Sequence, residues 1–167
     1  MKAQGDAFET LFRAEYARCV RIADRVLADR AEAEDVVQEI FIAFHGRHAP
    51  DADFAAAWLH QAAAHAALNR LRGRRRRERR EIDQAVESTA KSVDPADVME
   101  TNEQRKALHE ALGRMPAKPA AVLVLRSSGL SYQEVAKALG VGIGQVGTLL
   151  RRAEQALRKE VSRGSSV

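Results

Sequence analysis

The sequence has few of the residues that disulfide-stabilised, membrane-spanning or β-rich proteins need. Cys19 is the only cysteine among 167 residues, so no disulfide can form within the chain and a reducing cytoplasm is the expected setting. No apolar run approaches the ~18 residues of a membrane span, and the N-terminus carries acids in place of a signal peptide's long apolar region. Aromatic residues make up only 5% of the chain, and strand formers are scarce beside abundant alanine. We therefore expect an all-α, cytoplasmic protein with no membrane insertion of its own.

Apolar residues recur at helical spacing in two regions, which predicts two small helical domains. The first domain spans residues 1–80. It contains a long helix from about Phe8 to Leu27 with Cys19 in its core face, a second helix capped by Asp29, and a third that starts near Asp53. The pattern weakens over residues 81–101, where acids dominate and Asp94-Pro95 breaks helices, so we expect a flexible acidic linker there. The second domain spans residues 102–163, and residues 164–167 are expected to be a disordered tail.

The second domain contains the pattern of a helix-turn-helix. Ser131 and Glu134 have the spacing of a capping box, and Gly140 follows the apolar face of that helix where a left-handed residue is favoured. Ala136 is small where two helices must cross closely. A second helix, about residues 144–156, carries Gln145 and Thr148 near its start and arginines beyond them. The layout is typical of DNA-binding domains, in which the second helix enters the major groove, although an ordinary helical hairpin is the alternative.

Seven arginines lie between Arg72 and Arg80, at the end of the third helix. That helix also carries Trp58, His65, Asn69 and Arg70. Basic residues together with an aromatic ring and a side-chain amide suit contact with phosphates and unstacked bases. A solvated or partner-binding charge run is the alternative.

An acidic stripe precedes this helix, on the outer side of the predicted second helix. It consists of Glu32, Asp35, Gln38 and Glu39. The stripe is either a solvated surface or a docking face for a basic partner helix, and the segment alone favours the solvated surface.

Catalytic and metal sites have no candidate in the sequence. His45 and His48 are three residues apart and His60 and His65 five apart, and neither pair comes with an acid or a cysteine at a ligand spacing. No nucleophile elbow or glycine-rich phosphate loop is present. We expect a protein that is not an enzyme and that needs no metal and no cofactor.

Taken in order, three segments resemble the bacterial sigma-70 family of RNA polymerase sigma factors, of the compact extracytoplasmic-function (ECF) type. AEDVVQEIFIAFHGR resembles the segment that docks on the coiled coil of the polymerase beta-prime clamp. DFAAAWLHQAAAHAALNRLRGRRRR resembles the segment that melts the promoter and recognises its −10 element. LVLRSSGLSYQEVAKALGVGIGQVGTLLRRAEQAL resembles the domain that recognises the −35 element.

The resemblance implies a sigma region 2-like domain, a sigma region 4-like domain and a role for each segment. The implied partners are promoter DNA, RNA polymerase core through its beta-prime clamp coiled coil and beta flap, and an anti-sigma factor. The implied residues are Asp35, Gln38 and Glu39 for polymerase docking, Trp58, His65, Asn69, Arg70, Arg72, Arg74 and Arg75 for −10 DNA, and Ser131, Gln145, Thr148, Arg151 and Arg152 for −35 DNA.

The sequence departs from the family pattern at two places. His65 and Asn69 stand where family members often have an Asn-x-x-x-Asp pair, which changes the polar groups offered to the −10 element. Gly142, Gly144 and Gly147 lie at the start of the last helix, where the family usually has Ser or Thr and a basic residue. We therefore expect weak or unusual −35 recognition.

Two other function classes remain open at this point. A stand-alone helix-turn-helix regulator would bind DNA tightly without polymerase, whereas a sigma factor's two DNA-binding domains are not correctly spaced until core holds them. A helical nuclease would need a cluster of acids or histidines, which the sequence does not show. The docking segment favours the sigma factor.

Overall fold

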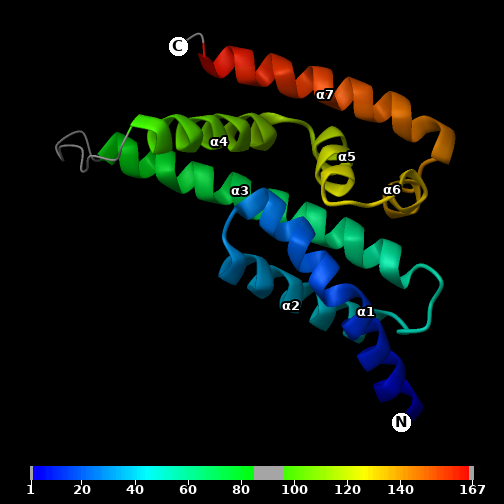
Figure 1. Ribbon diagram of the computed structural model, residues 1–167. Coiled ribbons are helices and arrows are strands. Elements are labelled where there is room, and N and C mark those ends of the chain that lie inside the picture. The colour runs from blue at the N-terminus through cyan, green and yellow to red at the C-terminus, as the bar shows by residue number, and fades with distance from the viewer. Residues whose placement is uncertain (1, 85–95, 166–167) are drawn as a thin grey trace.

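The computed structural model describes residues 2–84 and 96–165, and these two stretches form seven α-helices and no strand (Figure 1). For the described residues, this confirms the all-α prediction. In chain order the helices are α1 (Lys2–Leu27), α2 (Arg30–Arg47), α3 (Ala55–Gln84), α4 (Ala96–Arg114), α5 (Ala117–Ser127), α6 (Tyr132–Leu139) and α7 (Ile143–Ser165).

Helices α1–α3 form an N-terminal unit around one apolar core. The predicted cap of α2 is present, since the Asp29 side chain accepts a hydrogen bond from the Glu32 backbone N–H at 3.1 Å. Cys19 is fully buried in the core as expected, and burial raises the pKa of its thiol well above the ordinary range. Phe41 packs edge-on against Phe8 and Phe12, so α1 and α2 are joined by aromatic as well as aliphatic contacts.

The long helix α3 is rich in alanine, and this lets it pack on two sides. Ala63, Ala64 and Ala67 are completely buried, and small side chains allow neighbouring helix backbones to approach closely. In Figure 1, α3 lies between α1 and α2 on one side and α4–α7 on the other, and it contacts α1, α2, α4, α5 and α6. It is therefore the shared central element of both halves of the molecule.

Helices α4–α7 form a C-terminal unit in which the predicted helix-turn-helix is present in detail. The Ser131 side chain accepts from the Glu134 N–H at 3.1 Å, and the Glu134 carboxylate accepts from the Ser131 N–H at 3.0 Å, which completes the capping box. Gly140 ends α6 in the left-handed region with φ 67°. Val146 and Ala153 of α7 are fully buried.

Three predicted helix boundaries are wrong. The predicted linker 81–101 is helical at both ends, because α3 continues to Gln84 over the sequence EIDQ, in which Glu and Gln favour a helix, and α4 begins at Ala96 directly after the Pro95 breaker. Residues 85–95 of the predicted linker lie outside the described residues. The predicted disordered tail 164–167 is helical at residues 164–165, since α7 runs to Ser165, and residues 166–167 lie outside the described residues. Arg114 holds this last helix, donating to the Glu160 carboxylate at 3.0 Å and to the Glu160 carbonyl at 2.9 Å.

The two units pack against each other through polar contacts as well as through α3. Arg18 of α1 forms an ion pair with Glu134 of α6. Arg25 donates to the Ser127 carbonyl at 3.0 Å, and Arg72 donates to the Met115 carbonyl at 2.8 Å. The structure thus shows the two units in a closed arrangement, which the sequence did not specify.

Candidate nucleic-acid interface

The second helix of the helix-turn-helix presents its predicted DNA-binding side chains to solvent. Gln145, Thr148, Arg151 and Arg152 are all exposed, and their spacing places them on one side of α7. Ser131 is exposed as well. Its hydroxyl oxygen is already engaged by the capping box, which leaves the hydroxyl hydrogen free to donate. The face needed for major-groove contact is therefore accessible while the two units are packed together.

Gln145 has a local role that the sequence analysis missed. Its amide oxygen accepts a hydrogen bond from the Gly142 backbone N–H at 3.1 Å. This is one half of a capping box, and the other half is absent because glycine has no hydroxyl. The signal was present in the sequence, because Gln145 stands three residues after Gly142. A base contact by the Gln145 amide oxygen would compete with this bond.

Gly147 lies where α7 passes α6. A Cβ atom at this position would lie 3.8 Å from a ring carbon of Tyr132, which is ordinary van der Waals contact. A longer side chain therefore fits, and the missing basic residue at this position is not dictated by lack of space.

The exposed side of α3 carries some of the residues that were predicted to contact the −10 element. Asn69 is exposed and His65 half-buried one turn before it. Trp58 is also half-buried, and its ring packs against Phe44 and His48 at centroid distances of 5.4 Å and 5.4 Å. Stacking of an unpaired base on Trp58 would have to use the part of the ring face that Phe44 and His48 leave uncovered.

Four arginines predicted to bind DNA have contacts inside the protein. Arg70 pairs with Glu39 at 2.8 Å, and Arg74 donates to the Leu27 carbonyl at 3.1 Å and pairs with Glu32. Arg72 donates to two carbonyls of the C-terminal unit, those of Gly113 and Met115, and Arg75 lies against Gly113. Glu32 was predicted to belong to an exposed acidic stripe on α2. It is half-buried and paired with Arg74, so it is not part of that exposed surface. A DNA phosphate would have to replace these partners to bind the same four guanidinium groups.

The more accessible arginines belong to the basic run that was predicted to contact phosphates, but they were not among the residues assigned individually to −10 DNA. These are Arg76, Arg77, Arg79 and Arg80, all exposed and without a hydrogen-bond or ion-pair partner among the described residues. Arg76 and Arg80 continue the side of α3 that carries Asn69, at spacings of seven and eleven residues. Helical periodicity places Arg76 and Arg80 on a different side of α3 from Arg70 and Arg74, so the sequence alone could have distinguished these two pairs.

The predicted docking residues lie on the outer side of α2. Asp35, Gln38 and Glu39 are exposed. Ile42, one turn further along, is 72% exposed and adds an apolar group to this surface. We call Asp35, Gln38, Glu39 and Ile42 the docking surface; the sequence analysis missed Ile42.

The buried histidine, His60, makes a contact between two helices. The Nε2 atom of the buried His60 lies 2.6 Å from a carboxylate oxygen of Glu15, a contact between α3 and α1. Within residues 2–84 and 96–165, no three His, Cys, Asp or Glu side chains come together to hold a metal ion. In the same residues, no helix has the length and hydropathy to cross a membrane.

Comparison with known proteins agrees with this geometry in both units. Residues 11–77 match the family model of sigma-70 region 2, and residues 105–157 match that of sigma-70, region 4. The chain is 30% identical over 157 residues to the ECF RNA polymerase sigma factor SigM of Mycobacterium tuberculosis, a match covering 92% of this chain and 76% of SigM. The chain belongs to the sigma-70 family, in its ECF group.

Other relatives of this sigma-70 family member are similar over most of the chain. It is 28% identical over 163 residues to the ECF RNA polymerase sigma factor SigE of Mycolicibacterium smegmatis, covering 96% of this chain and 63% of SigE. It is 27% identical over 173 residues to SigW of Bacillus subtilis, covering 96% of this chain and 91% of SigW. The chain therefore spans less than two thirds of the length of SigE and most of the length of SigW.

Proposed function

We propose that this protein is a sigma factor, which binds RNA polymerase core and directs it to a subset of promoters. The observation that carries the proposal is the presence of region 2 and region 4 in family order on one chain, with an exposed docking surface on the first and an exposed helix-turn-helix face on the second. The role needs no catalytic residue of the protein's own. It places the protein in the cytoplasm, in agreement with its single buried cysteine.

The proposed partners are assigned to the faces as follows. The docking surface binds the coiled coil of the beta-prime clamp, α3 binds the −10 element, and the C-terminal unit binds the −35 element and the beta flap. An anti-sigma factor that covers the docking surface would keep the protein inactive. The acidic side chains and Ile42 of the docking surface fit a partner helix that offers both basic and apolar groups.

The closed arrangement must open for both promoter elements to be bound at once. The −10 and −35 elements lie about 25 base pairs apart, which is roughly 85 Å of B-DNA. Helix α3 has 30 residues, or a length of ~45 Å, and the helix-turn-helix packs directly on it. Binding to core is therefore expected to separate the two units, and the free protein is expected to bind promoter DNA weakly.

Capture of RNA polymerase core tests the proposal. Asp35→Arg reverses one charge on the docking surface without breaking an internal contact, unlike Glu39→Arg, which would place two arginines together. Asp6→Arg makes the same change at an exposed position on α1 and is the matched control. We expect the native protein and the control to capture core and Asp35→Arg to lose it.

Two results would contradict the proposal. Equal capture by all three proteins would show that the docking surface does not contact RNA polymerase core. No capture, combined with tight and specific binding of duplex DNA by the protein alone, would support a stand-alone regulator instead.

A further inference from the structure

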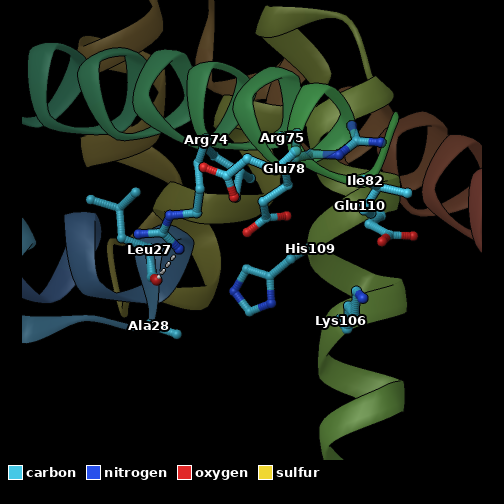
Figure 2. A pocket seen from close by; sticks show the side chains of 11 residues that line it. Leu27, Ala28, Arg74, Arg75, Glu78, Ile82, Lys106, His109 and Glu110 are labelled. Carbon is cyan, nitrogen blue, oxygen red and sulfur yellow. Dashed lines mark hydrogen bonds between the residues drawn. The ribbon is translucent and has the colours of Figure 1, made fainter. Parts of the chain in front are cut away.

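Two cavities lie along the C-terminal half of α3, and their charges differ. The larger, of about 460 Å³, opens between α3, α4 and the end of α1 (Figure 2). Its lining combines apolar side chains with three basic and three acidic ones, namely Arg74, Arg75, Lys106, Glu78, Glu81 and Glu110. Because these charges balance, this cavity has no preference for a cation or an anion.

The smaller cavity, of about 160 Å³, is lined by four arginines and no other residue. Arg72, Arg75, Arg76 and Arg79 follow one another at spacings of three, one and three residues, so one side of α3 carries them all. We call this cavity the arginine pocket. No carboxylate lines it, so its four positive charges are not neutralised from within.

The C-terminal unit holds two of these arginines in place. Arg72 donates to the carbonyls of Gly113 and Met115 at the end of α4, at 3.3 and 2.8 Å. Arg75 passes over Gly113 so closely that a Cβ atom there would lie 2.7 Å from its Nη1 atom. In Figure 2, Arg75 extends from α3 away from Leu27, whereas Arg74 turns towards the Leu27 carbonyl.

Positive charges lie close together where α3 meets the end of α4, and they repel one another. Burial lowers the pKa of Arg75, and the neighbouring guanidinium groups of Arg79 and Arg114 lower it further, while Glu110 and Glu78 act in the opposite direction. Arg114 itself is paired with Glu160. An anion between these groups would remove the repulsion.

We propose that the arginine pocket binds a compact phosphate anion, such as an inorganic oligophosphate or the phosphate chain of a nucleotide, and thereby holds the two units in the closed arrangement. Guanidinium groups match phosphate oxygens with pairs of hydrogen bonds. The volume of about 160 Å³ exceeds several-fold the ~30 Å³ that one water molecule occupies. Binding of such an anion needs neither polymerase nor a promoter, so the inference stands apart from the proposed function.

Isothermal titration with sodium tripolyphosphate at fixed ionic strength tests the inference. The pocket variant is Arg76→Gln/Arg79→Gln, and the matched control is Arg77→Gln/Arg80→Gln, which removes the same charge from the same helix outside the pocket. All four residues are exposed and have no hydrogen-bond or ion-pair partner among the described residues, so neither variant should unfold. We expect saturable binding at one site, about tenfold or more weaker in the pocket variant and within about twofold of native in the control. Equal weakening in both variants, or no saturation, would overturn the proposal.

Gly113→Ala tests whether the contact between Arg75 and the end of α4 shapes the phosphate site. Alanine favours a helix over glycine, so the variant should unfold at the same temperature as the native protein or higher. Its Cβ must displace the end of the Arg75 side chain, so tripolyphosphate affinity should fall several-fold. Native affinity in this variant would show that the C-terminal unit does not shape the site.

A phosphate of the DNA backbone has the same chemistry, and a competition experiment separates the two sources. We expect a short duplex without promoter elements to leave tripolyphosphate bound to the native protein. Displacement by the duplex that depends on Arg76 and Arg79, and not on Arg77 and Arg80, would assign the pocket to DNA and overturn the proposal of a small-molecule site.

Discussion

The contact between Arg18 and Glu134 joins the two units and can be tested separately from the fold of either. Arg18 NH2 donates to the Glu134 carboxylate at 3.1 Å, and the side chains are only 31% and 33% exposed. The same carboxylate accepts from the Ser131 N–H in the capping box. Glu134 therefore contributes both to the stability of α6 and to the closed arrangement.

Substitutions at this site separate the two contributions. Exposed ion pairs contribute about 0.2–1 kcal/mol, and partial burial places this one near the upper end, at about 1 kcal/mol. A helix cap contributes about 1 kcal/mol as well. Glu134→Gln keeps the capping box, since glutamine serves at this position, and should lower the free energy of unfolding by about 1 kcal/mol. Ser131→Ala should lower it by a similar amount, and Glu134→Ala by about 2 kcal/mol.

A double-mutant cycle with Arg18→Met and Glu134→Gln measures the pair itself. Urea unfolding followed by far-UV circular dichroism and by fluorescence of Trp58, the single tryptophan, gives each free energy. We expect a coupling of about 1 kcal/mol at low salt that shrinks as salt is added. A coupling of zero, alongside a normal loss for Ser131→Ala, would refute the reasoning, because it would mean that α1 and α6 do not meet.

The same contact predicts how stability depends on pH. Burial raises the pKa of Glu134, but hydrogen bonds from Ser131 and Arg18 and the charge of Arg18 outweigh burial and hold it below its ordinary value of 4.5. The ionised form is thus favoured by folding. Its contribution should be complete above pH 4.5 and should be lost as the pH falls through the lower folded-state pKa. The difference between the native protein and Glu134→Gln should shrink over that interval.

Three glycine and alanine positions give further predictions. Ala28 has φ 51°, so Ala28→Gly should raise the free energy of unfolding in urea by about 1 kcal/mol; a loss would show that the turn is unstrained. Gly142→Ser should complete the capping box with Gln145 and add a few tenths of a kcal/mol, which Gly142→Ala should not reproduce. Gly147→Lys should lower the Kd for promoter DNA measured by fluorescence anisotropy, because it adds a cation where there is room for a side chain. Unchanged or weaker binding would contradict that expectation.

The helix-turn-helix could be predicted closely because its signals are local. Ser131 and Glu134 are three residues apart, and Gly140 acts through its own backbone angle, so neither depends on distant parts of the chain. The limits of α3 and α4 were less predictable. The sequence EIDQ at 81–84 is compatible with a linker or a helix, and the choice depends on the helical turns before it.

The closed arrangement could not be predicted, because its contacts join residues far apart in the sequence. The Arg18–Glu134 pair spans 116 residues and the Arg25–Ser127 contact 102. The spacing of residues within one segment carries no information about which distant residue each of them contacts. The alanine content of α3 favours a helix, but it does not show that a second unit packs on that helix.

The arginine run shows why a charge cluster has no single function once it is placed on a helix. Arg70 and Arg74 turn towards the acids of α2, while Arg72 and Arg75 turn towards the end of α4. Arg76 and Arg80 remain on the solvent side that carries Asn69. Opening of the closed arrangement would release Arg72 and Arg75 from the C-terminal unit and leave Arg70 and Arg74 paired with α2. The basic surface available to DNA on α3 therefore depends on the arrangement of the two units, so that separation of the units and promoter binding by α3 should favour each other.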